Sequence, residues 1–172
     1  SGFRDGEAGA DVPAEMDFMQ EVLANTPPNI PVMGWWSYGV EGKGISEYEG
    51  VKASAGYGKF IAGSEFCSNL SVHSGVKVPP EAFTQSAQAT APEPKLDSDK
   101  LYLSLSVLDS GDAQWYWQTY QRKVWSDPNR GKVPIGWCVN PTLLDVMPGV
   151  LEWYYRNATP NDAFFCAMSG TG

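Results

Sequence analysis

The chain has 172 residues, 42% hydrophobic and 13% aromatic, and its formal net charge is −8 at pH 7. This length is sufficient for one domain with a hydrophobic core, and the composition excludes a disordered chain. Because nucleic-acid-binding proteins need clustered lysines and arginines to displace counterions, an acidic chain with no basic cluster is not expected to bind nucleic acid. The sequence also contains no apolar run that reaches the length of a membrane span.

Residues that commonly hold metal ions are scarce. The chain contains one histidine, His73, which cannot supply the several histidine ligands that are usual for zinc. The three cysteines, Cys67, Cys138 and Cys166, show no CxxC spacing and lie in apolar or mixed surroundings, which predicts buried thiols. We therefore expect this chain to hold no metal ion and no cofactor.

The first part of the chain predicts one helix and two strands. Residues 12–25 carry apolar side chains at helical spacing, and two prolines follow the run, which predicts a helix. The short apolar stretch 30–36 predicts a buried strand that leads into a glycine-rich loop containing Glu41. Residues 59–62 repeat this plan, with Glu65 in the polar loop that follows.

The middle of the chain predicts a surface connection, a strand and a helix. Residues 79–99 are rich in Pro, Ala, Gln, Thr and Ser, which is typical of a surface connection. In residues 100–109, leucines and a valine alternate with polar side chains, which predicts a strand that ends at Asp109. Residues 113–124 carry apolar side chains on one helical face, and Asp112 is a suitable N-cap for that helix.

The last part of the chain predicts a strand, a helix and a final strand. Residues 133–139 are mostly apolar and predict a strand, and Asn140 followed by a proline predicts the N-cap of the next helix. That helix has an apolar stripe of leucine, methionine, valine and tyrosine side chains, and Pro148 is expected to kink or split it. Residues 163–167 predict a final buried strand.

The alternation of strands and helices predicts an α/β fold made of βα units with a mostly parallel sheet. A complete (β/α)8 barrel usually needs about 250 residues. Residues 1–172 are therefore expected to form a single α/β domain, as a small open sheet or a partial barrel, or a fragment of a larger barrel domain. Right-handed crossovers place all strand-to-helix loops at one end of such a sheet, so polar residues in these loops are expected to share one rim.

Three carboxylates in these loops, Asp109, Glu41 and Glu65, are the candidates for acid–base chemistry. A carboxylate at the end of a parallel strand occupies the position where barrel enzymes place catalytic groups. Alternatively, Asp109 fixes the turn, Glu41 is a solvated loop charge, and Glu65 is a turn former. Glycoside hydrolysis needs two carboxyl groups, about 5 Å apart for retention or about 6.5–9.5 Å apart for inversion.

Amide, carboxylate and indole side chains in the same loops form a combination that suits a carbohydrate. Indole rings stack on the C–H faces of sugars, and amides and carboxylates hydrogen-bond to hydroxyl groups. The candidates for substrate binding are Trp36, Asn69, Asp112, Gln114, Trp115, Asn140 and Ser169. The same residue types also form ordinary caps and turns, and one of the two adjacent rings of Trp35 and Trp36 is expected in the core because neighbouring strand residues face opposite sides.

With these residues in view, the chain resembles the GxGYxYP family of glycoside hydrolases. The stretches that carry the resemblance are "PVMGWWSYGVEGKGI", "GKFIAGSEFCSNLSVHSG", "LDSGDAQW" and "DPNRGKVPIGWCVNPTLLDVMPGVLEWYYRNATPNDAFFCAMSGTG". In that family a strand ending in Ser-Gly leads into the Gly-x-Gly-Tyr-x-Tyr-Pro signature, and Gly170, Thr171 and Gly172 match its first three positions. We therefore expect a chain that stops within the signature.

The resemblance implies a barrel-like catalytic domain of an exported bacterial protein, extracellular or periplasmic, that acts on a polysaccharide or oligosaccharide. The family supplies no established catalytic pair, so the candidate carboxylates come from the loop positions alone. Two other functions remain open: a non-catalytic carbohydrate-binding module with the same aromatic and amide rim, and a metal-dependent hydrolase similar to polysaccharide deacetylases. We also expect the edge of the sheet to be covered by the remaining part of the same polypeptide or by another chain.

Overall fold

A computed structural model describes residues 11–34, 47–63, 67–85, 95–107 and 113–166 of the chain. The chain divides into two compact units, residues 1–65 and 66–172, and each unit is described by itself. Within both units the strands that pair are parallel, which confirms the prediction of a mixed α/β fold with parallel strands. The closure of this fold into a barrel stays a prediction, as does the expectation of a single domain.

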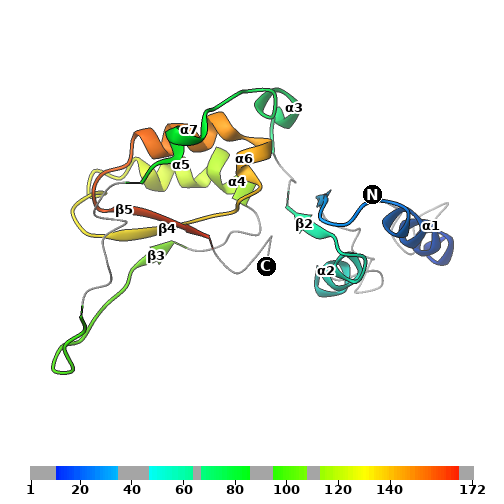
Figure 1. Cartoon of the computed structure of the whole chain (residues 1–172), viewed down its shortest axis with the longest axis horizontal. Helices are drawn as coiled ribbons and strands as arrows, with labels where there is room; N and C mark the ends of the chain where they lie inside the picture. Colours follow the sequence, from blue (N-terminus) through cyan, green and yellow to red (C-terminus); the bar gives the residue numbers. More distant parts are fainter. Residues whose placement is uncertain (1–10, 35–46, 64–66, 86–94, 108–112, 167–172) are drawn as a thin grey trace. The chain divides into compact units, whose positions relative to one another are not determined.

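The described residues of the first unit form two helices and a two-stranded parallel sheet (Figure 1). Its elements are α1 (Val12–Ala24), β1 (Pro31–Met33), α2 (Glu47–Gly56) and β2 (Phe60–Ala62). The buried ammonium group of Lys59 donates to the carbonyl oxygens of Thr26 and Tyr57, both at 3.0 Å. These bonds connect the chain after α1 to the start of β2. The predicted helix and both predicted strands of this unit are present, but the expectation that the first strand is buried is wrong, since Pro31 and Met33 of β1 are exposed and Val32 is half-buried.

The second unit is a three-stranded parallel sheet with strand order β3-β4-β5. Its strands are β3 (Ser106–Val107), β4 (Ile135–Val139) and β5 (Asp162–Cys166). Its helices are α3 (Leu70–His73), the 3-10 helix η2 (Pro80–Phe83), α4 (Ala113–Gln118), α5 (Tyr120–Trp125), α6 (Leu143–Val146) and α7 (Pro148–Arg156). The chain thus runs from strand to helix to strand, as expected for βα units.

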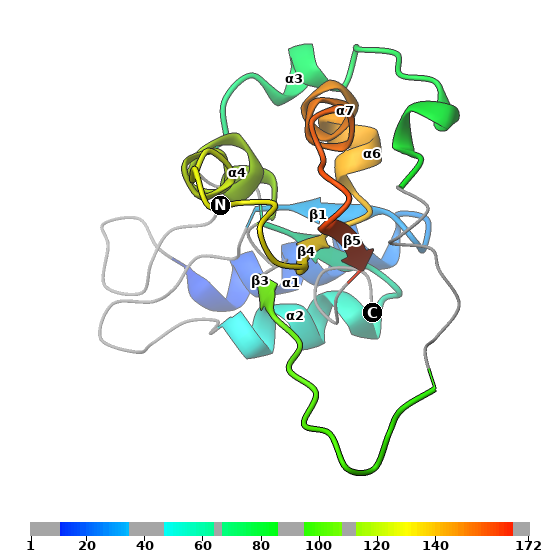
Figure 2. The ribbon, with the colours of Figure 1, turned by 90° about the vertical axis from the view of Figure 1, so that its left-hand side faces the viewer.

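Helices α4 to α7 cover one face of this sheet, as two views turned by 90° show (Figures 1 and 2). Strand residues that alternate along β4, such as Trp137 and Val139, join the core on that face, together with Phe164 of β5. The rings of Trp125 and Tyr154 lie edge to face with their centroids 5.0 Å apart, and those of Trp117 and Tyr154 lie 4.5 Å apart. The aromatic residues of the sequence therefore serve the core of this unit to a large extent.

Two helix breaks shape this core. Pro148 separates α6 from α7 and begins α7 at its first turn, as predicted, because proline lacks the N–H group that a helix interior requires. The second break was not predicted: the single helix expected over 113–124 is divided at Thr119, whose hydroxyl donates to the carbonyl of Trp115. As a result Gln121 and Trp125 are buried, whereas Tyr120, expected on the buried face, is 48% exposed.

Two other elements differ from the sequence prediction. Of the strand expected over 100–109, residues 100–105 are not in a strand and β3 begins at Ser106, while residues 108 and 109 lie outside the described residues. Leu101 and Leu103 are 98% and 83% exposed. In the described part of the chain β3 pairs with β4 alone, so the residues before it have no second strand to complete a ladder. Helix α2 was not predicted, although Ser46 and Glu49 have the spacing of a capping box.

A buried ionic network holds the amino ends of β4 and β5 together. The Asp162 carboxylate, at the start of β5, pairs with the guanidinium of Arg130 and accepts from the indole Nε1 of Trp137 at 2.7 Å. It also accepts from the backbone N–H and the hydroxyl of Thr159, both at 2.7 Å. Arg130 in turn donates to the carbonyl oxygen of Trp125 at 2.8 Å, and its guanidinium carbon lies 4.1 Å from the centre of that indole ring.

We expect Asp162→Ala to lower the free energy of unfolding by about 3–5 kcal/mol, because it leaves the largely buried Arg130 charge unpaired. Urea denaturation measures this change. The matched control is Glu152→Gln, which removes an exposed i,i+4 pair with Arg156 and should cost no more than about 0.5 kcal/mol. Equal losses in the two variants would show that the network does not stabilise the fold.

The stability of this unit should also fall in alkali. Burial raises the pKa of Tyr154 above its ordinary value of 10.0, while its hydroxyl donates to the carbonyl of Trp117 at 2.8 Å. The unfolded chain therefore releases this proton first, and each pH unit above about 10 should remove up to ~1.4 kcal/mol of stability. Tyr154→Phe should give a shallower decrease of Tm between pH 9 and pH 12. Parallel curves for the two proteins would contradict this assignment.

Candidate functional site

Three polar side chains meet at the carboxyl end of β4, the end where the sequence predicts a binding site. Asn140 directly follows β4, Thr142 precedes α6, and Gln114 lies in the first turn of α4. Gln114 Nε2 donates to Thr142 Oγ1 at 2.7 Å, and Thr142 Oγ1 donates to Asn140 Oδ1 at 2.9 Å. The structure therefore brings together two predicted site residues, Gln114 and Asn140, through a third residue that the sequence analysis did not single out.

This cluster of Gln114, Thr142 and Asn140 is buried. Gln114 and Asn140 are both 0% exposed, and Thr142 is 6% exposed. Asn140 Oδ1 also accepts from the backbone N–H of Thr142 at 3.0 Å, which closes a turn of the kind that asparagine favours after a strand. Asn140 therefore fixes the turn that precedes α6, whereas the sequence predicted Asn140 itself as the N-cap of this helix; the N-cap is Thr142. The sequence Asn140-Pro-Thr142 was the signal that could have indicated Thr142, because asparagine side chains often bond to the residue two positions later.

The loop that contains Asn69 is attached to the helix that follows β3. The side chain of Gln118, in α4, accepts from the backbone N–H of Ser68 and donates to its carbonyl oxygen, both at 2.8 Å. Asn69 itself is exposed and has a left-handed backbone with a φ of 57°. Trp115, on the same helix, is half-buried and contacts the ring of Tyr116 edge to face. Gln118 thus places the Asn69 loop beside α4.

The other predicted site residues lie outside the described residues. These are Trp36, Glu41, Glu65, Asp109, Asp112 and Ser169. The pairing of Asp109 with either glutamate and the binding role of the remaining side chains stay predictions.

Among the described side chains, no group of three or more His, Cys, Asp or Glu residues could hold a metal ion. None of the helices in the described ranges is both long and apolar enough to cross a membrane. The expectation of buried thiols is correct for Cys138 and wrong for Cys166, which is exposed at the end of β5, and Cys67 is half-buried.

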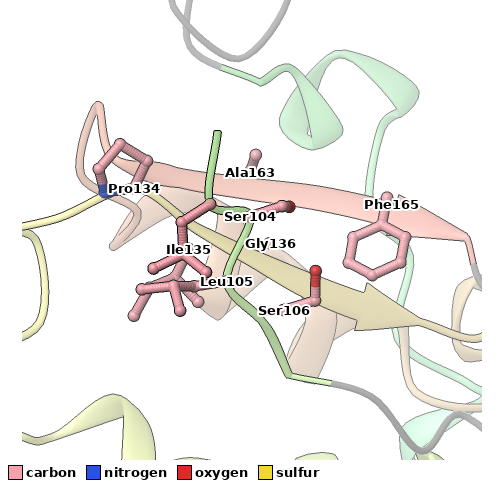
Figure 3. Close-up of a pocket in the computed structure, with 9 residues that line it drawn as sticks. Ser104, Leu105, Ser106, Pro134, Ile135, Gly136, Ala163 and Phe165 are labelled. Atoms are coloured by element: carbon pink, nitrogen blue, oxygen red, sulfur yellow. The ribbon is translucent and has the colours of Figure 1, made fainter. Parts of the chain in front are cut away.

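A concave feature lies on the face of the sheet opposite the helices. It is an open hollow of about 470 Å³, and its walls are mostly apolar (Figure 3). Its lining residues are Leu103, Ser104, Leu105, Ser106, Pro134, Ile135, Gly136, Ala163 and Phe165. The ring of Phe165 lies across Gly136, where a Cβ atom would come within 2.9 Å of it. The hollow contains no titratable side chain, so it is not the candidate for acid–base chemistry.

The fold and the buried cluster define an α/β protein that brings polar side chains to the carboxyl ends of parallel strands. Residues 99–172 match the family model "GxGYxYP putative glycoside hydrolase C-terminal domain", and residues 3–75 match the model "GxGYxYP third domain". The chain belongs to the GxGYxYP family, as the sequence motifs predicted. The cluster of Gln114, Thr142 and Asn140 lies within the match to the C-terminal domain.

A solved structure supports the fold. The chain is similar to a crystal structure of a "putative hydrolase" from Bacteroides thetaiotaomicron, with a TM-score of 0.74 and 19% sequence identity. The similarity covers 95% of this chain and 30% of that protein, so the chain spans less than a third of its length. No curated protein matches the chain.

We expect Asn140→Ala to lower the free energy of unfolding by about 1–3 kcal/mol, because the buried N–H and hydroxyl of Thr142 lose their acceptor. Asn69→Gly is the matched control: Asn69 is exposed and its left-handed backbone suits glycine, so the change should stay below about 0.5 kcal/mol. Urea unfolding curves of both variants measure the difference. A loss at Asn69 as large as that at Asn140 would contradict the assignment.

Proposed function

We propose that this chain forms part of a glycoside hydrolase that cleaves a polysaccharide or oligosaccharide at the carboxyl ends of its parallel strands. The observation that carries the proposal is the match of residues 99–172 to the C-terminal domain of a family described as glycoside hydrolases. Asp109 and the buried cluster all belong to this stretch. The buried polar cluster lies at the carboxyl end of β4. This position supports a site at that end of the sheet, because the loops there carry the catalytic residues of barrel enzymes.

In this proposal the chemistry needs two carboxyl groups with separate roles. Asp109 pairs with Glu41 or Glu65: one carboxylic acid protonates the leaving oxygen, and the other carboxylate attacks the sugar or activates a water molecule. Trp36 and Trp115 provide stacking surfaces for sugar rings, and Asn69, Asp112 and Ser169 bind hydroxyl groups. Because Gln114 and Asn140 are buried, they act from beneath the sugar site.

The proposal extends to the setting of the protein. We infer a bacterial protein that is exported to the periplasm or the extracellular space, where polysaccharides are found. We also infer that the free edge of β3 is covered by another part of the same polypeptide or by another chain. The exposure of Leu101 and Leu103 supports this second inference. Their alternation with polar residues is typical of a strand with one buried face, and such a face needs a partner to cover it.

Asp109→Asn should reduce hydrolysis of polysaccharide by the full-length protein about 10²–10⁴-fold, because the amide cannot transfer a proton. Release of reducing ends measures this loss, and Tm should not change. Asp145→Asn, at an exposed position on α6, is the control and should retain full activity.

Three outcomes would redirect the proposal. Hydrolysis by the Asp109→Asn protein at the wild-type rate would refute the role of Asp109. Binding of oligosaccharides without release of reducing ends would favour a carbohydrate-binding module. Release of acetate that is lost after chelation of metal ions would favour a metal-dependent deacetylase.

A further inference from the structure

One polar atom of the buried cluster lacks a hydrogen bond. Gln114 is fully buried, and its Oε1 has no hydrogen-bond partner among the described residues. A buried acceptor without a donor costs about 1–3 kcal/mol, so such atoms are generally satisfied by water or by a ligand. The Oε1 atom therefore marks a position where a donor is expected.

The cluster fixes which way the Gln114 amide points. The backbone N–H of Thr142 can only donate, so the Asn140 atom at 3.0 Å from it must be the oxygen Oδ1. The Thr142 hydroxyl lies 2.9 Å from the same oxygen and must donate its single hydrogen to it. Thr142 Oγ1 can then only accept from the side chain at 2.7 Å, so Gln114 presents Nε2 to it.

The opposite orientation of Gln114 is excluded by the same argument. Rotating the amide by 180° would place two acceptors, Gln114 Oε1 and Thr142 Oγ1, at hydrogen-bond distance with no hydrogen between them. A backbone N–H group, which cannot change its polarity, thus determines through two side chains that Gln114 Oε1 faces away from Thr142 as an acceptor.

We propose that Gln114 Oε1 is a preset acceptor for one small O–H donor at the carboxyl end of β4, with Thr142 and Asn140 as its positioning residues. The donor is a water molecule or a hydroxyl group of a sugar. The full burial of Gln114 favours water, which needs no opening of the structure. The sugar hydroxyl as a source rests on the proposed function, whereas the water does not.

Thr142→Val removes the hydroxyl with little change of shape, and Thr142→Ser retains it. High-resolution crystal structures of the full-length protein test the proposal. The wild type should show one ordered oxygen about 2.6–3.2 Å from Gln114 Oε1. Thr142→Ser should retain this oxygen, and Thr142→Val should lose it, because the Gln114 amide is no longer held in one orientation. A wild-type structure without this oxygen would overturn the proposal that Gln114 Oε1 accepts from a small O–H donor. Its retention in Thr142→Val would overturn the role of Thr142.

Two further measurements distinguish water from a sugar hydroxyl as the donor and test the acceptor separately from the proposed hydrolase function. In crystals soaked with glucose, replacement of the oxygen by a sugar hydroxyl identifies the sugar as the donor, and an unchanged position identifies water. On polysaccharide, kcat/KM should fall about 10-fold in Thr142→Val, the loss of roughly one hydrogen bond, and remain near wild type in Thr142→Ser. If no variant hydrolyses polysaccharide, the proposed function fails while the crystallographic result still decides the acceptor.

Discussion

The buried carboxylate of Asp162 is the interaction on which the second unit depends. It receives hydrogen bonds from Trp137 on β4, from Thr159 before β5, and from Arg130 in the loop that leads to β4. These bonds align the amino ends of β4 and β5, and the registered pairing then continues to Val139 opposite Cys166. Ile135, which pairs with Asp162, lies five residues before Asn140. At about 3.3 Å per residue, this separates Asp162 from the end of β4 by roughly 16 Å. The position of Asn140 therefore follows from a contact at the other end of the sheet.

The two ends of this sheet carry polar clusters of different character. At the amino end the Asp162 carboxylate accepts from Trp137 and Thr159 and pairs with Arg130, so the cluster is ionic, as expected for a contact that stabilises the fold. At the carboxyl end the cluster is neutral, and one buried acceptor, Gln114 Oε1, has no partner among the described residues. Proteins tolerate such local costs mainly at functional sites, and barrel-type folds keep chemistry at the carboxyl end and stability at the amino end. The described part of this unit follows that division only in part, because Gln121 Nε2 and Trp125 Nε1 on α5 also lack hydrogen-bond partners.

An element could be predicted from the sequence where neighbouring residues alone determine it, and could not where it depends on residues far along the chain. Pro148 acts through its own missing N–H group, so the division between α6 and α7 could be read from one residue. The leucine alternation before Val107 predicted a long strand, but a strand forms only where a neighbour supplies hydrogen bonds, and in the described structure the contact with β4 begins at the carbonyl of Leu105. The contact between Gln114 and Asn140 could not be predicted either, because it runs through Thr142, which lies two residues after Asn140 and meets Gln114 on α4, 28 residues away in the chain.

The two faces of the three-stranded sheet explain why aromatic content alone was an ambiguous guide to carbohydrate binding. Trp117, Trp125 and Trp137 all lie in the core beneath the helices, where rings fill space between layers. The opposite face carries the open hollow, whose lining contains no indole ring and includes Gly136, Ala163 and the ring of Phe165, which lies across Gly136. Most indole rings of the described part of this unit are thus used for packing, whereas Trp115 is half-buried and Trp153, on α7, is 38% exposed. Of these two rings, Trp115 is the one that directly follows Gln114 in α4. An argument for sugar binding therefore rests on Trp115 and on the polar carboxyl end of the sheet, where an amide of fixed orientation offers an acceptor to a hydroxyl group.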